Sequence, residues 1–343
     1  MHSGGSVRTL LPVALRVTVI GAGSWGTTVA ALAAAGHETV LWSRRKDVAD
    51  EIVTEHTNAA YLPGVVLPEG VRATPSMEEA VAAADVVVMA VPSHGFRDVL
   101  VEAAPFVRPW VPIVSLTKGL EIGTRLRMTE VVNDILPDHP AGALTGPNLA
   151  REIMAGQPAA AVMAFADERI AHSLQPVFHA HAFRVYTNLD IVGCEIGGVV
   201  KNVMAIAAGM VDGMGFGDNT KATLMTRGLG ELTRLGVALG GQPSTFAGLA
   251  GMGDLIATCM SPQSRNRRVG VELGKGRCLD DIVAETKMVA EGVRSSSVVI
   301  ELAERYGIEM PIAEQVRAVC HDGVSAADAL STLMRRRAGA EWE

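Results

Sequence analysis

The chain has 343 residues, of which 48% are hydrophobic and 20% are charged, and its formal net charge at neutral pH is −7. This apolar content excludes a disordered chain, and the acidic balance argues against a nucleic-acid-binding protein. The apolar run Val199–Val211 is long enough to consider as a membrane span, but Lys201 and Asn202 lie inside it. We therefore expect a soluble globular protein of about two domains without a membrane span.

Four cysteines are scattered along the chain, with no Cys-x-x-Cys pair and no zinc spacing. This pattern predicts reduced structural thiols, no bound metal and a cytoplasmic location. At the N-terminus, Arg8 and Leu10–Leu15 resemble a signal peptide only superficially, because the apolar stretch is short and no cleavage site follows it. Residues 1–15 are expected to form a loose or disordered extension.

Strand-like and helix-like segments alternate over residues 16–190. Arg16–Ile20 is a β-branched run that ends in glycine, and Trp25–Ala35 is an alanine-rich helix closed by Gly36. A further helix is predicted at Met77–Ala84, and further strands at Glu38–Trp42, Val86–Ala90, Val111–Leu116, Ala143–Thr145, Ala159–Phe165 and Phe183–Tyr186. Apolar strands that alternate with helices imply an α/β fold, a Rossmann-type doubly wound sheet covered on both faces.

After about Asp190 the strand-like runs end, and residues 191–343 are predicted to be helical throughout. The expected helices are Gly198–Met210, Lys221–Leu239, Thr245–Met260, Leu279–Val283, Ser295–Tyr306, Pro311–Cys320 and Ala326–Arg337. We place the boundary between the two domains near Asp190, so that residues 16–190 form the dinucleotide-binding domain and residues 191–343 a helical domain.

The sequence Gly21-Ala-Gly23-Ser-Trp-Gly26 is a Gly-x-Gly-x-x-Gly motif between a predicted strand and a predicted helix. In that context the first glycine permits a tight turn, the second lets the backbone approach a pyrophosphate, and the third lets the helix pack on the strand. The helix N-terminus then offers N–H groups to the phosphates. The alternative is an ordinary glycine turn.

The end of the second strand indicates which dinucleotide binds. An acidic residue there would bind the ribose 2′-hydroxyl of NAD, whereas this chain has Arg44 and Arg45 and no carboxylate at that point. Two guanidinium groups suit the 2′-phosphate of NADP, so we predict that NADP is preferred over NAD. The alternative is a solvated basic turn.

Two lysines occupy unusual positions. Lys118 directly follows the strand that ends at Leu116, where ligands bind in such folds. Lys201 lies inside an apolar helix, where desolvation would lower its pKa and suit it to act as a general acid near neutral pH. The alternatives are a surface lysine in a turn for Lys118, and a lysine that extends out of a half-buried helix for Lys201.

A third polar stretch begins with Asp254, which follows two glycines, and continues with Thr258 and the run Ser264-Arg-Asn-Arg-Arg268. Guanidinium, hydroxyl and amide donors together are what a phosphate monoester needs. Asp254 as a simple helix N-cap and the basic run as a solvated turn are the alternatives. The three stretches together predict reduction of a small phosphorylated ketone, with a lysine as proton donor and a nicotinamide as hydride donor.

The chain resembles bacterial NAD(P)-dependent glycerol-3-phosphate dehydrogenase. The matching motifs occur in the family's order between Arg16 and about Met334: Gly21-Ala-Gly-Ser-Trp-Gly-Thr27, Val91-Pro-Ser-His94, Thr117-Lys-Gly119, Gly146-Pro147, Val200-Lys-Asn-Val203, Gly251-Met-Gly-Asp-Leu255 and Ser264-Arg-Asn-Arg-Arg268. The resemblance implies interconversion of dihydroxyacetone phosphate and sn-glycerol 3-phosphate for glycerophospholipid synthesis. It also implies a fold like that of 6-phosphogluconate dehydrogenase, with a helical domain that binds substrate and forms a homodimer.

The resemblance also assigns roles by matched position. Lys201 is the family's proton donor in reduction and acceptor in oxidation, Lys118 contacts substrate and cofactor, and Asp254 pairs with the catalytic lysine or the substrate hydroxyls. The remaining implied substrate positions are Gly146, Asn148, Thr258, Ser264, Arg265 and Asn266. The implied cofactor positions are Gly21, Gly23, Ser24, Trp25, Gly26, Arg44, Arg45, Lys118, Ala150, Arg265, Val289 and Glu291.

One position departs from the family pattern, because Asn148 stands where Ser or Thr often follows Gly-Pro. Two other functions stay open from the residues alone. A related two-domain reductase acting on a 2-hydroxy acid or a ketopantoate-like acid would need a carboxylate clamp in place of the basic run. A non-enzymatic NADP sensor would not need a desolvated lysine.

Overall fold

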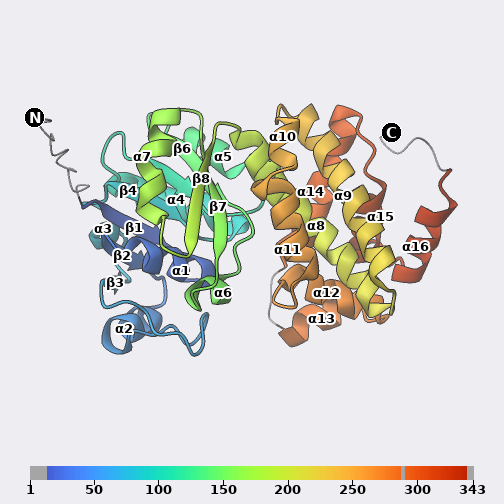
Figure 1. Cartoon of the computed structure of the whole chain (residues 1–343), viewed down its shortest axis with the longest axis horizontal. Helices are drawn as coiled ribbons and strands as arrows, with labels where there is room; N and C mark the ends of the chain where they lie inside the picture. The colour runs from blue at the N-terminus through green and yellow to red at the C-terminus, as the bar shows by residue number, and fades with distance from the viewer. Residues whose placement is uncertain (1–13, 287–289, 338–343) are drawn as a thin grey trace, which may run out of the picture.

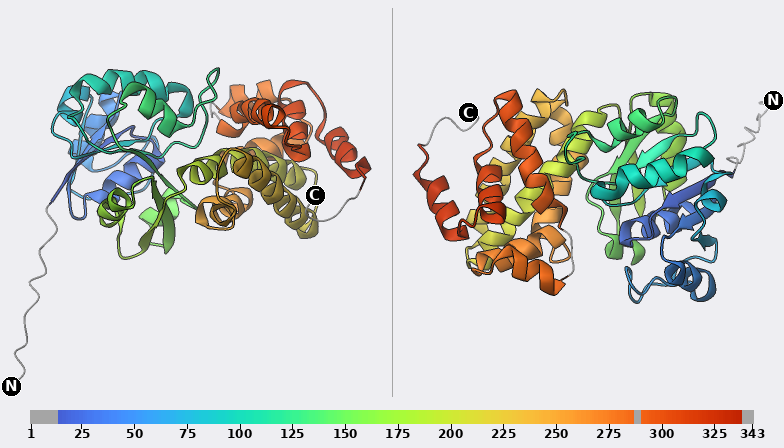
Figure 2. Two further views of the ribbon diagram at one scale, coloured as in Figure 1. Left: turned by 90° about the horizontal axis from the view of Figure 1, so that it is seen from above. Right: turned by 180° about the vertical axis from the view of Figure 1, so that it is seen from behind.

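The computed structural model describes residues 14–286 and 290–337. Figure 1 shows two lobes side by side, one built on a twisted sheet and one built of helices alone. The last strand of the sheet ends at Asn188, and the helical lobe begins with a helix at Ile191. Figure 2 shows the same two lobes from above and from behind.

The sheet has eight strands in the order β3-β2-β1-β4-β5-β6-β7-β8. The strands are β1 (Arg16–Ile20), β2 (Glu38–Trp42), β3 (Val71–Thr74), β4 (Val86–Met89), β5 (Ile113–Ser115), β6 (Ala141–Thr145), β7 (Ala159–Phe165) and β8 (Phe183–Asn188). The first six are parallel in the doubly wound order 3-2-1-4-5-6. Strand β7 runs antiparallel to β6, and β8 is parallel to β7. The predicted fold class is confirmed.

Helices cover both faces of the sheet, as continuous apolar strands require. One face is packed by side chains of α1 (Ser24–Ala33), α2 (Lys46–Glu55) and α7 (Glu168–Phe178). The other face is packed by α3 (Met77–Val81), α4 (Phe96–Ala103) and α5 (Met128–Ile135). Short helix α6 (Ala150–Met154) follows β6. Strand β3 and helices α2, α4, α5, α6 and α7 were not predicted from the sequence.

Helix α8 (Ile191–Gly213) is the centre of the helical lobe. It is long and apolar enough to cross a membrane by composition alone, but 89% of its most apolar window is buried inside the protein. The helices around it are α9 (Asp218–Ala238), α10 (Pro243–Phe246), α11 (Asp254–Met260), α12 (Arg265–Gly274), α13 (Leu279–Thr286), α14 (Glu291–Tyr306), α15 (Pro311–His321) and α16 (Ala326–Arg335). Glycines on α8 and α12 bring these two backbones into contact, since a Cβ at Gly270 would lie 2.0 Å from the Ile206 carbonyl oxygen.

One prediction for this lobe is wrong, and one helix was missed. The single helix expected at Thr245–Met260 is divided into α10, a π-helical turn at Leu249–Gly253 and α11. Glycine permits the break, because Gly251 approaches Phe246 so closely that a Cβ there would lie 2.2 Å from the Phe246 carbonyl oxygen. Helix α12 was not predicted, although Ser264 is its N-cap and accepts a hydrogen bond from the Arg267 amide.

Candidate active site

The glycine motif forms the turn between β1 and α1. Gly21 has a φ of +117°, and a Cβ there would lie 2.6 Å from the Ala90 carbonyl oxygen. A Cβ at Gly26 would lie 2.0 Å from the Gly21 carbonyl oxygen, whereas Gly23 faces open space. Gly23 is the N-cap of α1 and provides no side-chain cap, so the first N–H groups of the helix stay available to an anion. This geometry fits a dinucleotide pyrophosphate.

The turn after β2 carries the two arginines. Both are exposed, and buried Ser43 fixes the turn by donating a hydrogen bond to the Arg45 carbonyl oxygen at 3.0 Å. The expectation that no carboxylate lies at this point is wrong, because Arg45 Nε donates to Asp47 Oδ1 at 3.1 Å and the two side chains form an ion pair. Arg44 makes no hydrogen bond or ion pair with another residue in the described part of the chain.

The two predicted lysines meet at one buried carboxylate. Lys118 Nζ donates to Asp254 Oδ2 at 2.6 Å and to the Gly146 carbonyl oxygen at 3.0 Å. Lys201 Nζ donates to Asp254 Oδ1 and, at 2.7 Å, to Thr258 Oγ1. Lys118 follows β5, Lys201 lies on α8, and Asp254 begins α11, so the cluster joins the two lobes.

This arrangement excludes the simpler interpretations of these three residues. Lys201 is 5% exposed and Asp254 is 1% exposed, so Lys201 does not extend into solvent. Asp254 accepts hydrogen bonds from two ammonium groups, and Gly253 is the N-cap of α11. Lys118 Nζ is hydrogen-bonded to both Asp254 and the Gly146 carbonyl oxygen, so it is not a free surface lysine.

The electrostatics of the cluster favour proton exchange near neutral pH. The pKa of Lys201 is lowered to about 7: burial is the main cause, the Asp254 carboxylate opposes it, and the nearby Lys118 cation adds to the lowering. Two cations that share one buried carboxylate cannot both be fully compensated. A lysine in this state can both give and take a proton at physiological pH.

The basic run opens α12 beside this cluster. Ser264 caps the helix, and exposed Arg265 makes no hydrogen bond or ion pair with other residues of the described ranges. Arg267 is turned away, since it pairs with Asp212 at 2.6 Å. The interpretation of the whole run as a solvated turn is therefore wrong, because the segment is the N-terminus of a helix and carries at least one unpaired guanidinium group.

Asn266 is buried and mostly occupied by protein contacts. Its Nδ2 donates to Asn202 Oδ1 at 2.9 Å, and its Oδ1 accepts from the Gly292 amide at 2.9 Å. Asn202 Nδ2 in turn lies 3.5 Å from the Lys118 carbonyl oxygen. The structure thus places Asn266 at the cluster, with one N–H of its amide left over for a ligand.

Other predicted positions are divided between the two lobes. Glu291, at the start of α14, accepts hydrogen bonds from the Ser93 hydroxyl at 2.7 Å and the Ser93 amide at 3.3 Å. The amide of Asn148 and the Nε1 of Trp25 are buried without a hydrogen-bond partner among the described residues. Unpartnered buried polar atoms fit a place where cofactor or substrate would bind. Ala150 begins α6 two positions after Asn148, and Val289 lies outside the described residues.

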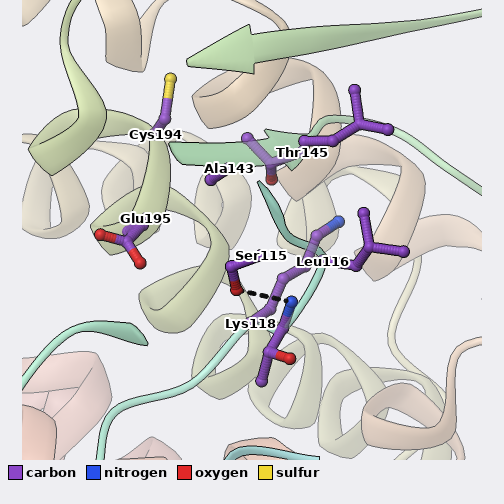
Figure 3. Close-up of a pocket in the computed structure, with 9 residues that line it drawn as sticks. Ser115, Leu116, Lys118, Ala143, Thr145, Cys194 and Glu195 are labelled. Atoms are coloured by element: carbon purple, nitrogen blue, oxygen red, sulfur yellow. Dashed lines mark hydrogen bonds between the residues drawn. The ribbon is translucent and has the colours of Figure 1, made fainter. Parts of the chain in front are cut away.

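One buried charged residue beside the site was missed. Glu195, on α8 six positions before Lys201, accepts hydrogen bonds from the Thr129 amide at 3.0 Å, the Thr129 hydroxyl at 2.5 Å and Arg127 Nη1 at 2.7 Å. Figure 3 shows Glu195 and Cys194 on α8 across a small cavity from Lys118, Ser115 and Thr145. The sequence pattern that indicated Lys201, a charged residue inside an apolar helix, could also have indicated Glu195.

Comparisons with known proteins cover nearly the whole chain. The family model for the NAD-dependent glycerol-3-phosphate dehydrogenase N-terminus matches residues 16–171, and the model for the C-terminus of that family matches residues 190–331. Glycerol-3-phosphate dehydrogenase (NAD(P)+) 2 of Sphingopyxis alaskensis is 59% identical over 95% of this chain and 98% of its own length. The Mycobacterium avium glycerol-3-phosphate dehydrogenase (NAD(P)+) is 51% identical over 95% of this chain and 96% of its own. A crystal structure of glycerol-3-phosphate dehydrogenase from Coxiella burnetii is 37% identical and superposes with a TM-score of 0.90 over 94% of this chain and 99% of that one.

Proposed function

The chain belongs to the NAD-dependent glycerol-3-phosphate dehydrogenase family and reduces dihydroxyacetone phosphate to glycerol 3-phosphate with NAD(P)H, and we propose that Lys201, Lys118 and Asp254 form its catalytic centre. The observation that carries this proposal is the buried Lys201 ammonium, bound to Asp254 and Thr258 and with a pKa of about 7. Family membership leaves no support for the two other functions, a 2-hydroxy-acid reductase and an NADP sensor.

In this proposal Lys201 Nζ donates a proton to the substrate carbonyl oxygen during reduction and takes one from the hydroxyl during oxidation. The nicotinamide, when bound, supplies or accepts the hydride. Asp254 holds the Lys201 ammonium in place and offsets its charge, and Thr258 fixes the direction of its N–H groups. Lys118 lies on the sheet lobe, where its hydrogen bond to the Gly146 carbonyl oxygen positions it. In this proposal it contacts both substrate and cofactor.

We assign the substrate phosphate to the N-terminus of α12, where Ser264 caps the helix and Arg265 has no protein partner in the described ranges. A helix N-terminus and a guanidinium group are complementary to a phosphate dianion. Asn266, Gly146 and Asn148 complete the substrate contacts. The unpaired carboxamide of Asn148 can donate and accept, as the Ser or Thr of the family pattern would.

We also propose that NADPH is preferred over NADH. The turn at Gly21, Gly23 and Gly26 would hold the pyrophosphate, and the turn that carries Arg44 and Arg45 would receive the adenosine end. Glu291, Ser24, Trp25, Ala150, Val289 and Arg265 complete the cofactor contacts. Replacement of both Arg44 and Arg45 by alanine should lower the ratio of kcat/KM for NADPH to that for NADH, and an unchanged ratio would remove this assignment.

The domains and the assembly follow the same proposal. Residues 16–190 bind the cofactor, residues 191–343 bind the substrate and form a homodimer through the helical lobe, and the protein works in the cytoplasm. The four free cysteines, three of them buried, support a reducing compartment. Analytical ultracentrifugation tests the homodimer, since a monomer at assay concentration would contradict it.

The catalytic assignment has a direct test. Purified Lys201→Ala protein should lose oxidation of NADPH in the presence of dihydroxyacetone phosphate, while NADPH titrated into it still changes its fluorescence as in the unaltered protein. Retained turnover would overturn the assignment of Lys201. Lost turnover together with lost cofactor binding would also contradict it, because Lys201 would then hold the cofactor site together.

A further inference from the structure

The charged segment after β2 contains two cations that are already paired. Arg45 forms a two-point ion pair with Asp47 through Nε and Nη2. Lys46 Nζ pairs with Asp50 at 2.9 and 2.6 Å from its two carboxylate oxygens. Arg44 alone of these three basic residues has no partner within the described ranges. The positive charge offered to a ligand is therefore smaller than the sequence suggests.

Asp47 is held in this place by more than Arg45. Arg45 is the N-cap residue of α2, and Asp47 lies in the first turn of that helix, where the helix dipole favours a carboxylate. The hydrogen bond from Arg45 is the main cause that lowers the pKa of Asp47, so the carboxylate is ionised at neutral pH. The bond from Ser43 Oγ to the Arg45 carbonyl oxygen fixes the backbone that carries both charges.

We propose that Asp47 is a specificity-determining residue, which limits selectivity for NADPH by holding the Arg45 guanidinium away from the adenosine 2′-phosphate. This inference rests on the proposed use of Arg44 and Arg45 for that phosphate. A guanidinium edge that binds one carboxylate with two donors cannot offer the same donors to a phosphate. The carboxylate itself also repels a group of nearly two negative charges.

As a consequence, only one of the two arginines in this turn is free to bind the 2′-phosphate. Arg44 is the main contact to the 2′-phosphate, and the Arg45–Asp47 pair contributes almost no net charge. An exposed ion pair is worth little, so Asp47 competes only weakly with the phosphate for Arg45, and the effect on selectivity is moderate. NADH, which lacks the 2′-phosphate, is unaffected by the pair and remains a usable cofactor.

The test measures binding and does not depend on turnover. Isothermal titration compares adenosine 2′,5′-bisphosphate with adenosine 5′-monophosphate, which differ only in the 2′-phosphate. Asp47→Asn should bind the bisphosphate about fivefold more tightly, as expected for release of an exposed charged partner, and should bind the monophosphate within about twofold of the unaltered protein. Asp50→Asn is the matched control, because it removes the same charge one turn later without releasing an arginine.

A double variant separates release of Arg45 from a general change in charge. Removing both members of a neutral pair in Arg45→Ala/Asp47→Asn should return the bisphosphate affinity to that of the unaltered protein. A tighter-binding double variant, or an Asp50→Asn variant that gains as much as Asp47→Asn, would overturn the role of Asp47. So would an Asp47→Asn variant that does not gain, while the unaltered protein still prefers the bisphosphate.

The failure of the proposed function gives a different result. If the unaltered protein binds the bisphosphate and the monophosphate equally, and Arg44→Ala changes neither, then the turn after β2 does not bind a 2′-phosphate. That outcome overturns the proposed NADP preference and this inference with it. Asp47 and Asp50 are both exposed, so the variants test the ligand contact and not the fold.

Discussion

Replacement of Asp254 by asparagine tests the central electrostatic argument. The change keeps the shape of the side chain but removes the carboxylate that Lys201 and Lys118 share. Because that carboxylate supports the charged form of Lys201, its loss should lower the pKa of Lys201 below its present value of about 7. The proton needed for reduction would then be held only at more acidic pH.

The magnitude follows from the contacts. Unit charges about 4 Å apart interact by about 4 kcal/mol at an effective dielectric constant of about 20, and one pKa unit corresponds to about 1.4 kcal/mol. The full interaction would shift the pKa by about 3 units. Relaxation of the two lysines and entry of water reduce this shift, so we expect a fall of about 2 units. The buried cations left behind should also lower the free energy of unfolding by about 3–5 kcal/mol.

The assay is kcat/KM for dihydroxyacetone phosphate, measured from pH 5 to pH 9 for both proteins. The substrate phosphate titrates near pH 6 in both experiments, so the ratio of variant to unaltered protein isolates the enzyme group. That ratio should fall about 50-fold between pH 5 and pH 8, because the variant is already half deprotonated at pH 5, and should be constant above pH 8. In the oxidation direction, the pH at which the rate reaches its plateau should move down by the same amount, because one group serves both directions.

Thr258→Val is the matched control, since it removes a neutral hydrogen bond to the same ammonium and leaves the charge in place. Its ratio to the unaltered protein should change little with pH. A pH-independent ratio for Asp254→Asn, with a folded variant, would refute the reasoning. It would mean that the pH dependence comes from a group other than Lys201.

Three further predictions concern the framework of the site. Gly270→Ala should lower the free energy of unfolding by about 1–3 kcal/mol in urea titration, because a Cβ there meets the backbone of α8, whereas Gly36→Ala, which meets nothing within 4 Å, should not. Gly26→Ala should weaken NADPH binding at least about tenfold by fluorescence titration, because its Cβ would displace the turn that receives the pyrophosphate. Burial raises the pKa of Glu231 to about 7, so its contribution to stability is complete below about pH 4.5 and is lost as the pH rises through 7. Glu231→Gln should therefore flatten the change in melting temperature between pH 5 and pH 7.5, and an unchanged slope would show that another group causes it.

The sequence allowed the elements and chemistry to be predicted wherever one local pattern decided them. The glycine turn and the strands around it follow from composition and spacing alone. Lys201 was visible because a charge inside an apolar helix needs a partner or a task. The break at Leu249–Gly253 was not visible, because apolar spacing continues through it and the close approach of Gly251 to Phe246 appears only in the folded chain.

The same reasoning could not predict contacts between residues that are far apart in the sequence. Lys118 and Asp254 are 136 positions apart, so no spacing rule brings them together. Arg45 and Asp47 are only two positions apart in the sequence. Whether the Asp47 carboxylate repels a ligand or forms an ion pair with the arginine depends, however, on the directions of the two side chains. Asn266 shows the same limit, because its residue type suits a phosphate while most of its amide is bound to Asn202 and Gly292.

The position of one lobe against the other determines the chemistry of Lys201. Asp254, on the same lobe as Lys201, raises its pKa, and Lys118, on the sheet lobe, lowers it. A shift of the sheet lobe would move only Lys118, and would therefore change the proton affinity of Lys201 without moving its own helix. Glu195 opposes such a shift, because it joins α8 to the start of α5 through Thr129 and Arg127. A buried carboxyl group with three hydrogen bonds resists displacement, since each bond lost leaves a buried polar atom without its partner. The same helix thus carries the proton donor and the contact that keeps its electrostatic environment constant.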